Sequence, residues 1–160
     1  MEFFENLEKG IYQKGLFDEE AKRWAQELRN EGQGQNKLKS SQFRNYFHEF
    51  RRLEDVFERY KREAGSDTEQ AWRKLLSQIE LLRAKLAYGG RSNGGPLQNF
   101  PLFRQKMDEL LSEAKKSEKH FAATMLFLEA VLAYFYGLEG ERNHESAPRG
   151  PERPQSHGRR

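Results

Sequence analysis

The stretch FAATMLFLEAVLAYFYGL, residues 121–138, is apolar almost all round and decides the fold class. Its 18 residues lie at the lower edge of the length that a membrane-spanning helix needs. Glu129 stands in the middle, and a central carboxylate costs about 2.5–3.5 kcal/mol on membrane insertion. We therefore expect no membrane anchor but the buried helix of a small bundle, with Glu129 at an edge of the helix or paired with a cation.

Four further helices are predicted before this segment, and 160 residues suffice for one core. The fold class is therefore all-α, a single compact five-helix bundle, and no alternating stretch predicts a strand. Apolar spacing places three of these helices at residues 18–30, 66–88 and 101–117. The remaining one begins at residue 40 or 41 and extends beyond residue 60. The core is expected to include these six side chains: Phe50, Trp72, Leu75, Ile79, Met125 and Leu128.

Helix ends are marked by capping residues. The hydroxyl of Ser40 or Ser41 is expected to cap the second helix, and Ser66 with Glu69 forms a capping-box pattern at the start of the third. Pro101 suits the first turn of the fourth helix. These signals predict one folded helical domain over residues 1–138. Residues 139–160 are rich in Pro, Gly, Arg, Glu and Ser, so we expect a disordered polar tail that contributes little to folding.

The positive charge is concentrated in two blocks. Residues 37–62 carry eight Lys and Arg against four Asp and Glu, and residues 83–91 carry three cations and no acid. The whole chain has a net charge of only +3, so the remaining sequence is acidic overall. Such clustering is typical of a nucleic-acid footprint, although basic residues that only solubilise helix faces give the same pattern.

No catalytic or metal-binding constellation is recognisable. The chain has no cysteine, and its four histidines show no ligand spacing, so no metal and no cofactor are predicted. His48 is the one residue that could serve acid–base chemistry on RNA, because it lies among arginines. The amino-terminal MEFFENLEKG carries glutamates where a secretory signal would carry lysines, so a cytoplasmic location is the default expectation.

A phosphate site is predicted where the second helix begins. Its N-terminal N–H groups and dipole favour an anion, and hydroxyl, amide and cationic donors gather there. These residues are Lys37, Lys39, Ser40, Ser41, Gln42 and Arg44.

Three segments resemble a known family, the small α-helical subunit of type III-A CRISPR effector complexes, known as Csm complexes. They are KLKSSQFRNY (residues 37–46), LRAKLAYGGR (82–91) and FLEAVLAY (127–134), in the family's order. The chain departs from the family pattern at Ser40, where threonine is common, at Ala84, where proline is expected, and in its longer tail.

The resemblance implies a non-catalytic subunit in antiviral defence. Its partners would be guide RNA and target RNA, the other subunits of the complex and further copies of itself, which stack into a filament. Contacts would go to phosphate and ribose, since base pairing already reads the sequence. The RNA-binding residues would be the six at the helix start together with Arg51, Arg52, Arg83, Lys85 and Arg91. Two alternatives remain: a helical protein–protein adaptor without RNA binding, and a small ribonuclease using His48.

Overall fold

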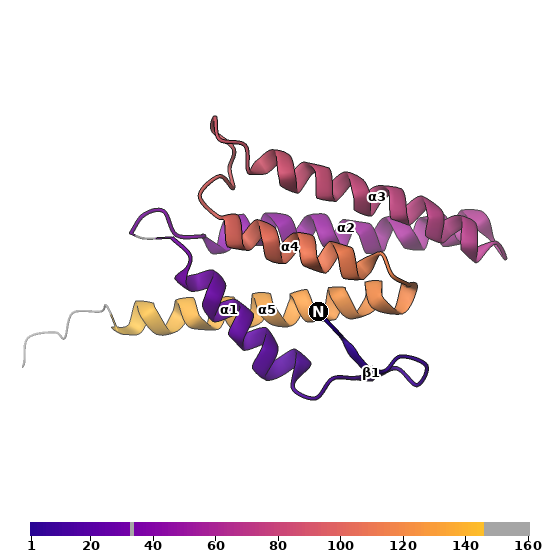
Figure 1. The fold of residues 1–160 in the computed structure, drawn as a ribbon, viewed down its shortest axis with the longest axis horizontal. Coiled ribbons are helices and arrows are strands. Elements are labelled where there is room, and N and C mark those ends of the chain that lie inside the picture. Colours follow the sequence, from indigo (N-terminus) through magenta and orange to yellow (C-terminus); the bar gives the residue numbers. More distant parts are fainter. Residues whose placement is uncertain (33, 146–160) are drawn as a thin grey trace, which may run out of the picture.

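The computed structural model describes residues 1–32 and 34–145, with side chains described up to residue 140. Figure 1 shows a helical bundle in which α1 crosses α5 obliquely, while α2, α3 and α4 run more nearly along it. The elements are β1 (Phe4–Asn6), β2 (Ile11–Tyr12), the π-helical turn η1 (Leu16–Glu20), α1 (Ala21–Asn30), α2 (Ser40–Ala64), α3 (Thr68–Gly89), α4 (Pro101–Ala114) and α5 (Glu118–Glu145). The predicted all-α class with five helices is confirmed.

A short antiparallel hairpin precedes the helices, and the sequence did not predict it. The strands β1 and β2 pair through Phe4 and Tyr12, whose rings stack at 5.0 Å. Strands of three and two residues are too short for an alternating pattern to stand out. The hairpin is nevertheless part of the core, because Phe3 is fully buried against Phe127 of α5, with ring centroids 5.7 Å apart.

The helix α5 lies at the centre of the packing, as its apolar sequence predicted. It contacts α1, α2, α4 and the turn η1. The exposed position of Glu129 agrees with the predicted helix edge. By length and composition alone Glu118–Gly140 is apolar enough to cross a membrane, but half of its most apolar window is buried within the bundle. The apolar character of α5 is therefore accounted for by helix packing.

Aromatic contacts join the helices around α5. The ring of Phe43 on α2 meets Phe103 on α4 at 5.3 Å and Phe135 on α5 at 5.2 Å, both edge to face. Such edge-to-face pairs add to the free energy gained by burial. Five of the six predicted core side chains are buried. Trp72 is only half-buried, because it packs edge to face on Phe57 near the turn between α2 and α3, at the periphery.

The start of α3 corrects a predicted cap. Asp67, not Ser66, is the N-cap residue, and its carboxylate accepts a hydrogen bond of 3.0 Å from the backbone N–H of Gln70. The cap therefore lies one residue later than predicted. Gly65 has a φ of 60°, and the turn that it forms leaves Ser66 outside the helix. A carboxylate at this place also interacts favourably with the helix dipole.

Replacement of Asp67 by alanine is expected to lower the free energy of unfolding by about 0.5–2 kcal/mol, because an N–H group of the first turn loses its acceptor. Chemical denaturation of the purified chain measures this loss. Ser66→Ala is the matched control, since the Ser66 side chain makes no hydrogen bond among the described residues. A larger loss for Ser66→Ala than for Asp67→Ala would contradict the assignment.

The helix α4 begins at Pro101, as predicted, and ends at Ala114, three residues before the predicted end. Its first turn is capped from far along the chain: the carboxylate of Glu31 accepts hydrogen bonds from the N–H groups of Leu102 at 2.6 Å and Phe103 at 2.9 Å. These groups have no partner within the helix, so Glu31 both satisfies them and ties the α1–α2 loop to α4.

The predicted boundary at residue 138 falls inside α5, which continues to Glu145. Glu139 accepts a hydrogen bond from the hydroxyl of Ser40 and pairs with Arg29 at 3.4 Å. The end of α5 is therefore tied to the start of α2, which is why the helix continues past its last apolar residue. The expected disorder of the tail concerns residues 146–160, which lie outside the described residues.

Candidate nucleic-acid interface

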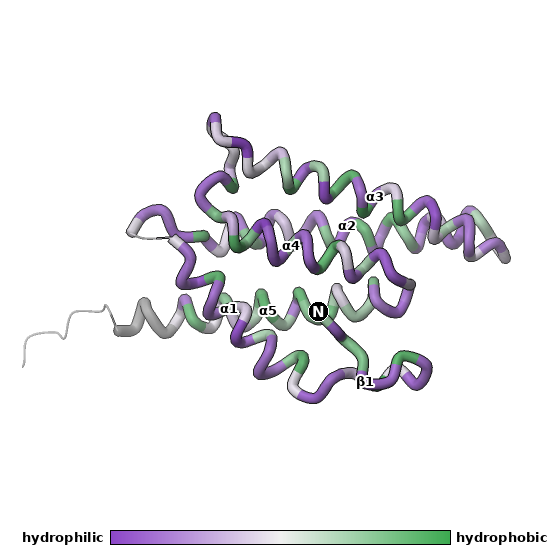
Figure 2. Tube along the Cα trace, viewed as in Figure 1, coloured by the Kyte–Doolittle hydropathy of each residue, from purple (hydrophilic) through white to green (hydrophobic). Residues whose placement is uncertain are grey.

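Both basic blocks of the sequence reach one end of the bundle. The helices α2 and α3 are joined by a short turn at one end and separate towards the other (Figure 1). The separated end holds the start of α2, the end of α3, and the α1–α2 and α3–α4 loops. The α1–α2 loop is mostly hydrophilic (Figure 2). Residues far apart in the sequence therefore share one surface.

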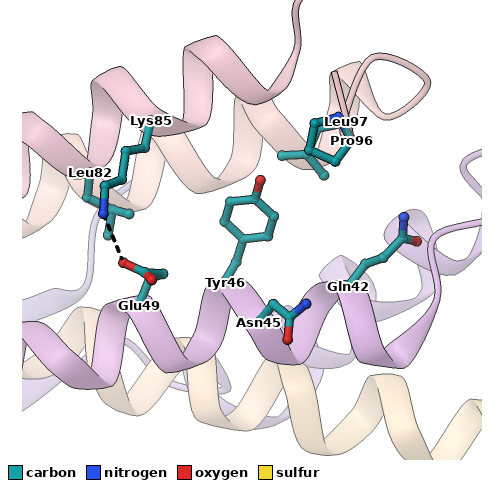
Figure 3. A pocket seen from close by; sticks show the side chains of 8 residues that line it. All are labelled: Gln42, Asn45, Tyr46, Glu49, Leu82, Lys85, Pro96 and Leu97. Carbon is teal, nitrogen blue, oxygen red and sulfur yellow. Dashed lines mark ion pairs between the residues drawn. The ribbon is translucent and has the colours of Figure 1, made fainter. Parts of the chain in front are cut away.

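A cleft of about 310 Å³ opens between α2 and α3 at this end (Figure 3). One wall is a face of α2, the other combines α3 with the following loop, and Figure 3 shows Tyr46 standing between them. The lining residues are Gln42, Asn45, Tyr46, Glu49, Leu82, Lys85, Pro96 and Leu97.

The loop that closes this cleft depends on Gly95. The N–H of Leu97 donates a 2.8 Å hydrogen bond to the carbonyl of Gly89, which folds the loop back onto the end of α3. A Cβ at Gly95 would lie 2.4 Å from that same carbonyl oxygen. Only glycine permits this approach without moving the backbone.

The start of α2 is capped differently from the prediction. The backbone N–H of Lys39 donates a 2.9 Å hydrogen bond to the side-chain oxygen of Gln42, while the Ser40 hydroxyl turns to Glu139. The predicted hydroxyl cap is therefore wrong, because the end of α5 takes the Ser40 side chain. Ser41 is exposed and stays near the first turn, where the free N–H groups favour an anion.

The two lysines before α2 keep their charges available. Lys39 is exposed and Lys37 is half-buried, and neither forms an ion pair with another described residue. Leu38 between them is buried and holds this segment against the core. The lysines therefore lie on an anchored stretch of chain.

Arg44 is held by the C-terminal part of α5. Its Nε donates a hydrogen bond of 2.5 Å to the hydroxyl of Tyr136, and its guanidinium carbon lies 5.2 Å from the centre of that ring. Arg44 remains exposed, so its other N–H groups still face solvent. The contact orients the guanidinium beside the start of α2.

Further along α2, the predicted cations pair with acids of the same helix. Arg51 lies 3.1 Å from Glu54, and Arg52 lies 4.0 Å from Glu49. Exposed pairs of this kind contribute little to stability, but they lower the local positive potential. The middle of α2 is therefore less basic than its start.

The second basic block divides between two surfaces. Arg83 donates two hydrogen bonds, of 2.7 and 2.9 Å, to the carboxylate of Asp108 on α4. Lys85 instead lines the cleft, where it pairs with Glu49 at 3.5 Å and stays exposed. Arg91 stacks on the exposed ring of Tyr88 at 4.1 Å. Lys85 and Arg91 therefore stay on the surface near the cleft, whereas Arg83 links α3 to α4.

The sequence reasoning missed two residues at the centre of the cleft. Asn45 is exposed and makes no hydrogen bond within the described part of the chain, and the hydroxyl of Tyr46 likewise has no partner there. Burial, helped by the negative charge of Glu49, raises the pKa of Tyr46, so its hydroxyl stays protonated and can donate. The available signal was the helical spacing of residues 42, 45, 46 and 49, polar on a face directed towards α3.

Among the side chains described, those of residues 1–32 and 34–140, no three His, Asp or Glu gather where they could hold a metal ion. His48 is exposed on α2, and its ring makes no hydrogen bond or ion pair with another described residue. An acid–base residue is normally oriented by such a partner.

Comparison with known proteins agrees with the resemblance seen in the sequence. The family model described as Csm2 Type III-A matches residues 12–140. No curated protein and no solved structure matches the chain. The matched range includes all five helices except the last turn of α5, and it contains every residue of the cleft.

Proposed function

The chain belongs to the Csm2 family, the small subunit of the type III-A Csm effector complex, and from this we propose that it binds the backbone of guide RNA and target RNA without cleaving it. In this proposal the subunit supports filament assembly in antiviral defence. Its partners are the two RNA strands, other subunits of the complex and further copies of the same chain, in the cytoplasm.

The observation that carries the proposal is the convergence of cations at the separated end of α2 and α3. Lys39 comes from the loop before α2, Lys85 from α3 and Arg91 from the loop after it. Cations on several elements can reach successive phosphates of one backbone, and each phosphate neutralised strengthens binding. Lys39 and Arg91 form no ion pair with another described residue, whereas Lys85 shares the carboxylate of Glu49 and stays exposed.

Within this surface the predicted residues have different roles. We propose that Lys37, Lys39, Ser41, Lys85 and Arg91 contact phosphate or ribose directly, with Arg44 beside them. Three others act mainly within the protein, through the contacts described above: Ser40, Gln42 and Arg83. Arg52, like Lys85, lies near the carboxylate of Glu49 and stays exposed. Arg51 lies farther along α2 and is partly neutralised by Glu54.

The surroundings of His48 support the proposed non-catalytic role. A ribonuclease needs a second group to orient its base or to protonate the leaving oxygen, and no described side chain bonds to His48. The proposal therefore leaves cleavage to another component of the complex.

The adaptor alternative has one observation in its favour. Several large apolar side chains of the described residues are exposed, among them Leu81 on α3 at 57%, Leu126 on α5 at 48% and Ile11 of β2 at 47%. Exposed apolar residues of this size often mark protein contacts, and a subunit of a complex needs such contacts as well. The adaptor hypothesis differs from the proposed function only because it includes no contact with RNA.

The deciding experiment is a salt titration of RNA binding by the full chain. We expect binding of a guide–target RNA duplex of any sequence, with affinity that falls linearly in a log–log plot against salt. Incubation of the same samples should leave the RNA intact. Absence of binding at low salt would favour the adaptor, and cleavage that is lost in His48→Ala with unchanged affinity would establish the ribonuclease.

A further inference from the structure

The cleft between α2 and α3 has a chemistry different from that of the phosphate-binding surface around it. Its walls include the apolar side chains of Leu82, Pro96 and Leu97, and its interior holds the carboxylate of Glu49 (Figure 3). That carboxylate pairs with Lys85 at 3.5 Å, so the interior offers no unpaired positive charge to a phosphate. A neutral, partly apolar group suits the interior better, with charges kept at the rim.

The polar groups in the cleft suit a ligand that carries both donors and acceptors. The amide of Asn45 offers both, and so does the hydroxyl of Tyr46; neither has a partner among the described residues. The side-chain nitrogen of Gln42 likewise has no partner among the described residues, while its oxygen caps the helix. These three side chains lie on one face of α2, at helical spacing.

The flat, apolar element of the cleft is the ring of Tyr46. It is half-buried, and its centre lies 5.6 Å from that of the Phe103 ring, with 66° between the two ring planes. Aromatic side chains next to cations are the usual platform for a nucleobase, and stacking tolerates every base because every base has a π-face. Amides that both donate and accept hydrogen bonds likewise suit more than one base edge.

We infer that this cleft receives one unpaired nucleobase of the bound RNA, with Asn45 contacting its edge and Tyr46 its face. The inference rests on the proposed RNA-binding function and adds a ligand for a site beside the phosphate contacts. Lys85 at the rim and Lys39, one turn before Gln42, are placed to hold the flanking phosphates. A paired base cannot enter, because its edge and both its faces are already occupied in the duplex.

The test uses the full chain and two guide–target RNA duplexes, one fully paired and one with a single unpaired 2-aminopurine nucleotide. We expect the parent to bind the second duplex about tenfold more tightly. The 2-aminopurine emission should change on binding, because the base leaves one stacked environment for another. Asn45→Ala and Tyr46→Leu should each abolish the preference and the emission change, with the affinity for the paired duplex kept.

Asn99→Ala is the matched control, since Asn99 is also an exposed asparagine but lies outside the cleft. Asn45 is exposed, so its replacement should leave the fold intact even if Tyr46→Leu lowers stability. If the parent binds both duplexes equally, or if Asn45→Ala keeps the preference, the inference is wrong while the proposed function stands. If the parent binds neither duplex, both are wrong.

Discussion

Simultaneous replacement of Lys37, Lys39 and Lys85 by alanine is expected to weaken RNA binding by the full chain to a similar degree for unrelated sequences. These lysines come from both sides of the separated end of α2 and α3. The log–log slope of affinity against salt should become shallower by about 0.7 to 0.9 for each phosphate contact that is lost. A residue that reads bases would instead change the ranking of sequences.

Arg83→Ala provides the matched control for charge, because it also removes one cation from a predicted RNA-binding position. The guanidinium of Arg83 is bound to Asp108, and both side chains are at least a third exposed. Its loss should therefore leave the salt slope unchanged and lower the stability by about 1 kcal/mol or less. If the triple variant binds RNA as tightly as the parent and Arg83→Ala binds it more weakly, the lysines do not contact RNA and Arg83 does.

Replacement of Phe103 by alanine is expected to lower the free energy of unfolding by about 3–5 kcal/mol. Its ring is fully buried and meets Phe43 at 5.3 Å and Tyr46 at 5.6 Å. The variant leaves a cavity between α4 and α2, directly behind the cleft, so cleft geometry should suffer as well. Chemical denaturation followed by circular dichroism measures the loss.

Leu81→Ala is the control for that prediction, because Leu81 is also a large apolar residue of a helix but is 57% exposed. Its truncation removes little buried surface, and the stability should change by about 0.5 kcal/mol or less. A loss as large as that of Phe103→Ala would mean that Leu81 is buried in solution, as in an association of copies. The melting curve would then depend on protein concentration.

Helix positions and the two basic blocks were predictable because both depend on neighbours along the chain. The near-continuous apolar run of residues 121–138 identified the central helix, and Gly89, Gly90 and Pro101 marked where α3 ends and α4 begins. The family resemblance also rested on such local segments. The first-turn capping details at Ser40 and Ser66 were wrong, because the chain direction before each helix selects the capping residue.

The tertiary structure decided which contacts within the protein each predicted cation makes. Arg44 and Arg83 look alike in the sequence, but one lies against Tyr136 and the other binds Asp108, residues 92 and 25 positions away. The cleft itself exists because α2 and α3 separate while Glu31 and Gly95 hold the adjoining loops. The angles at which helices pack, and contacts between residues distant in the sequence, determine the surroundings of each cation and the shape of the cleft. The helical periodicity of a single segment carries no information about packing angles or distant contacts.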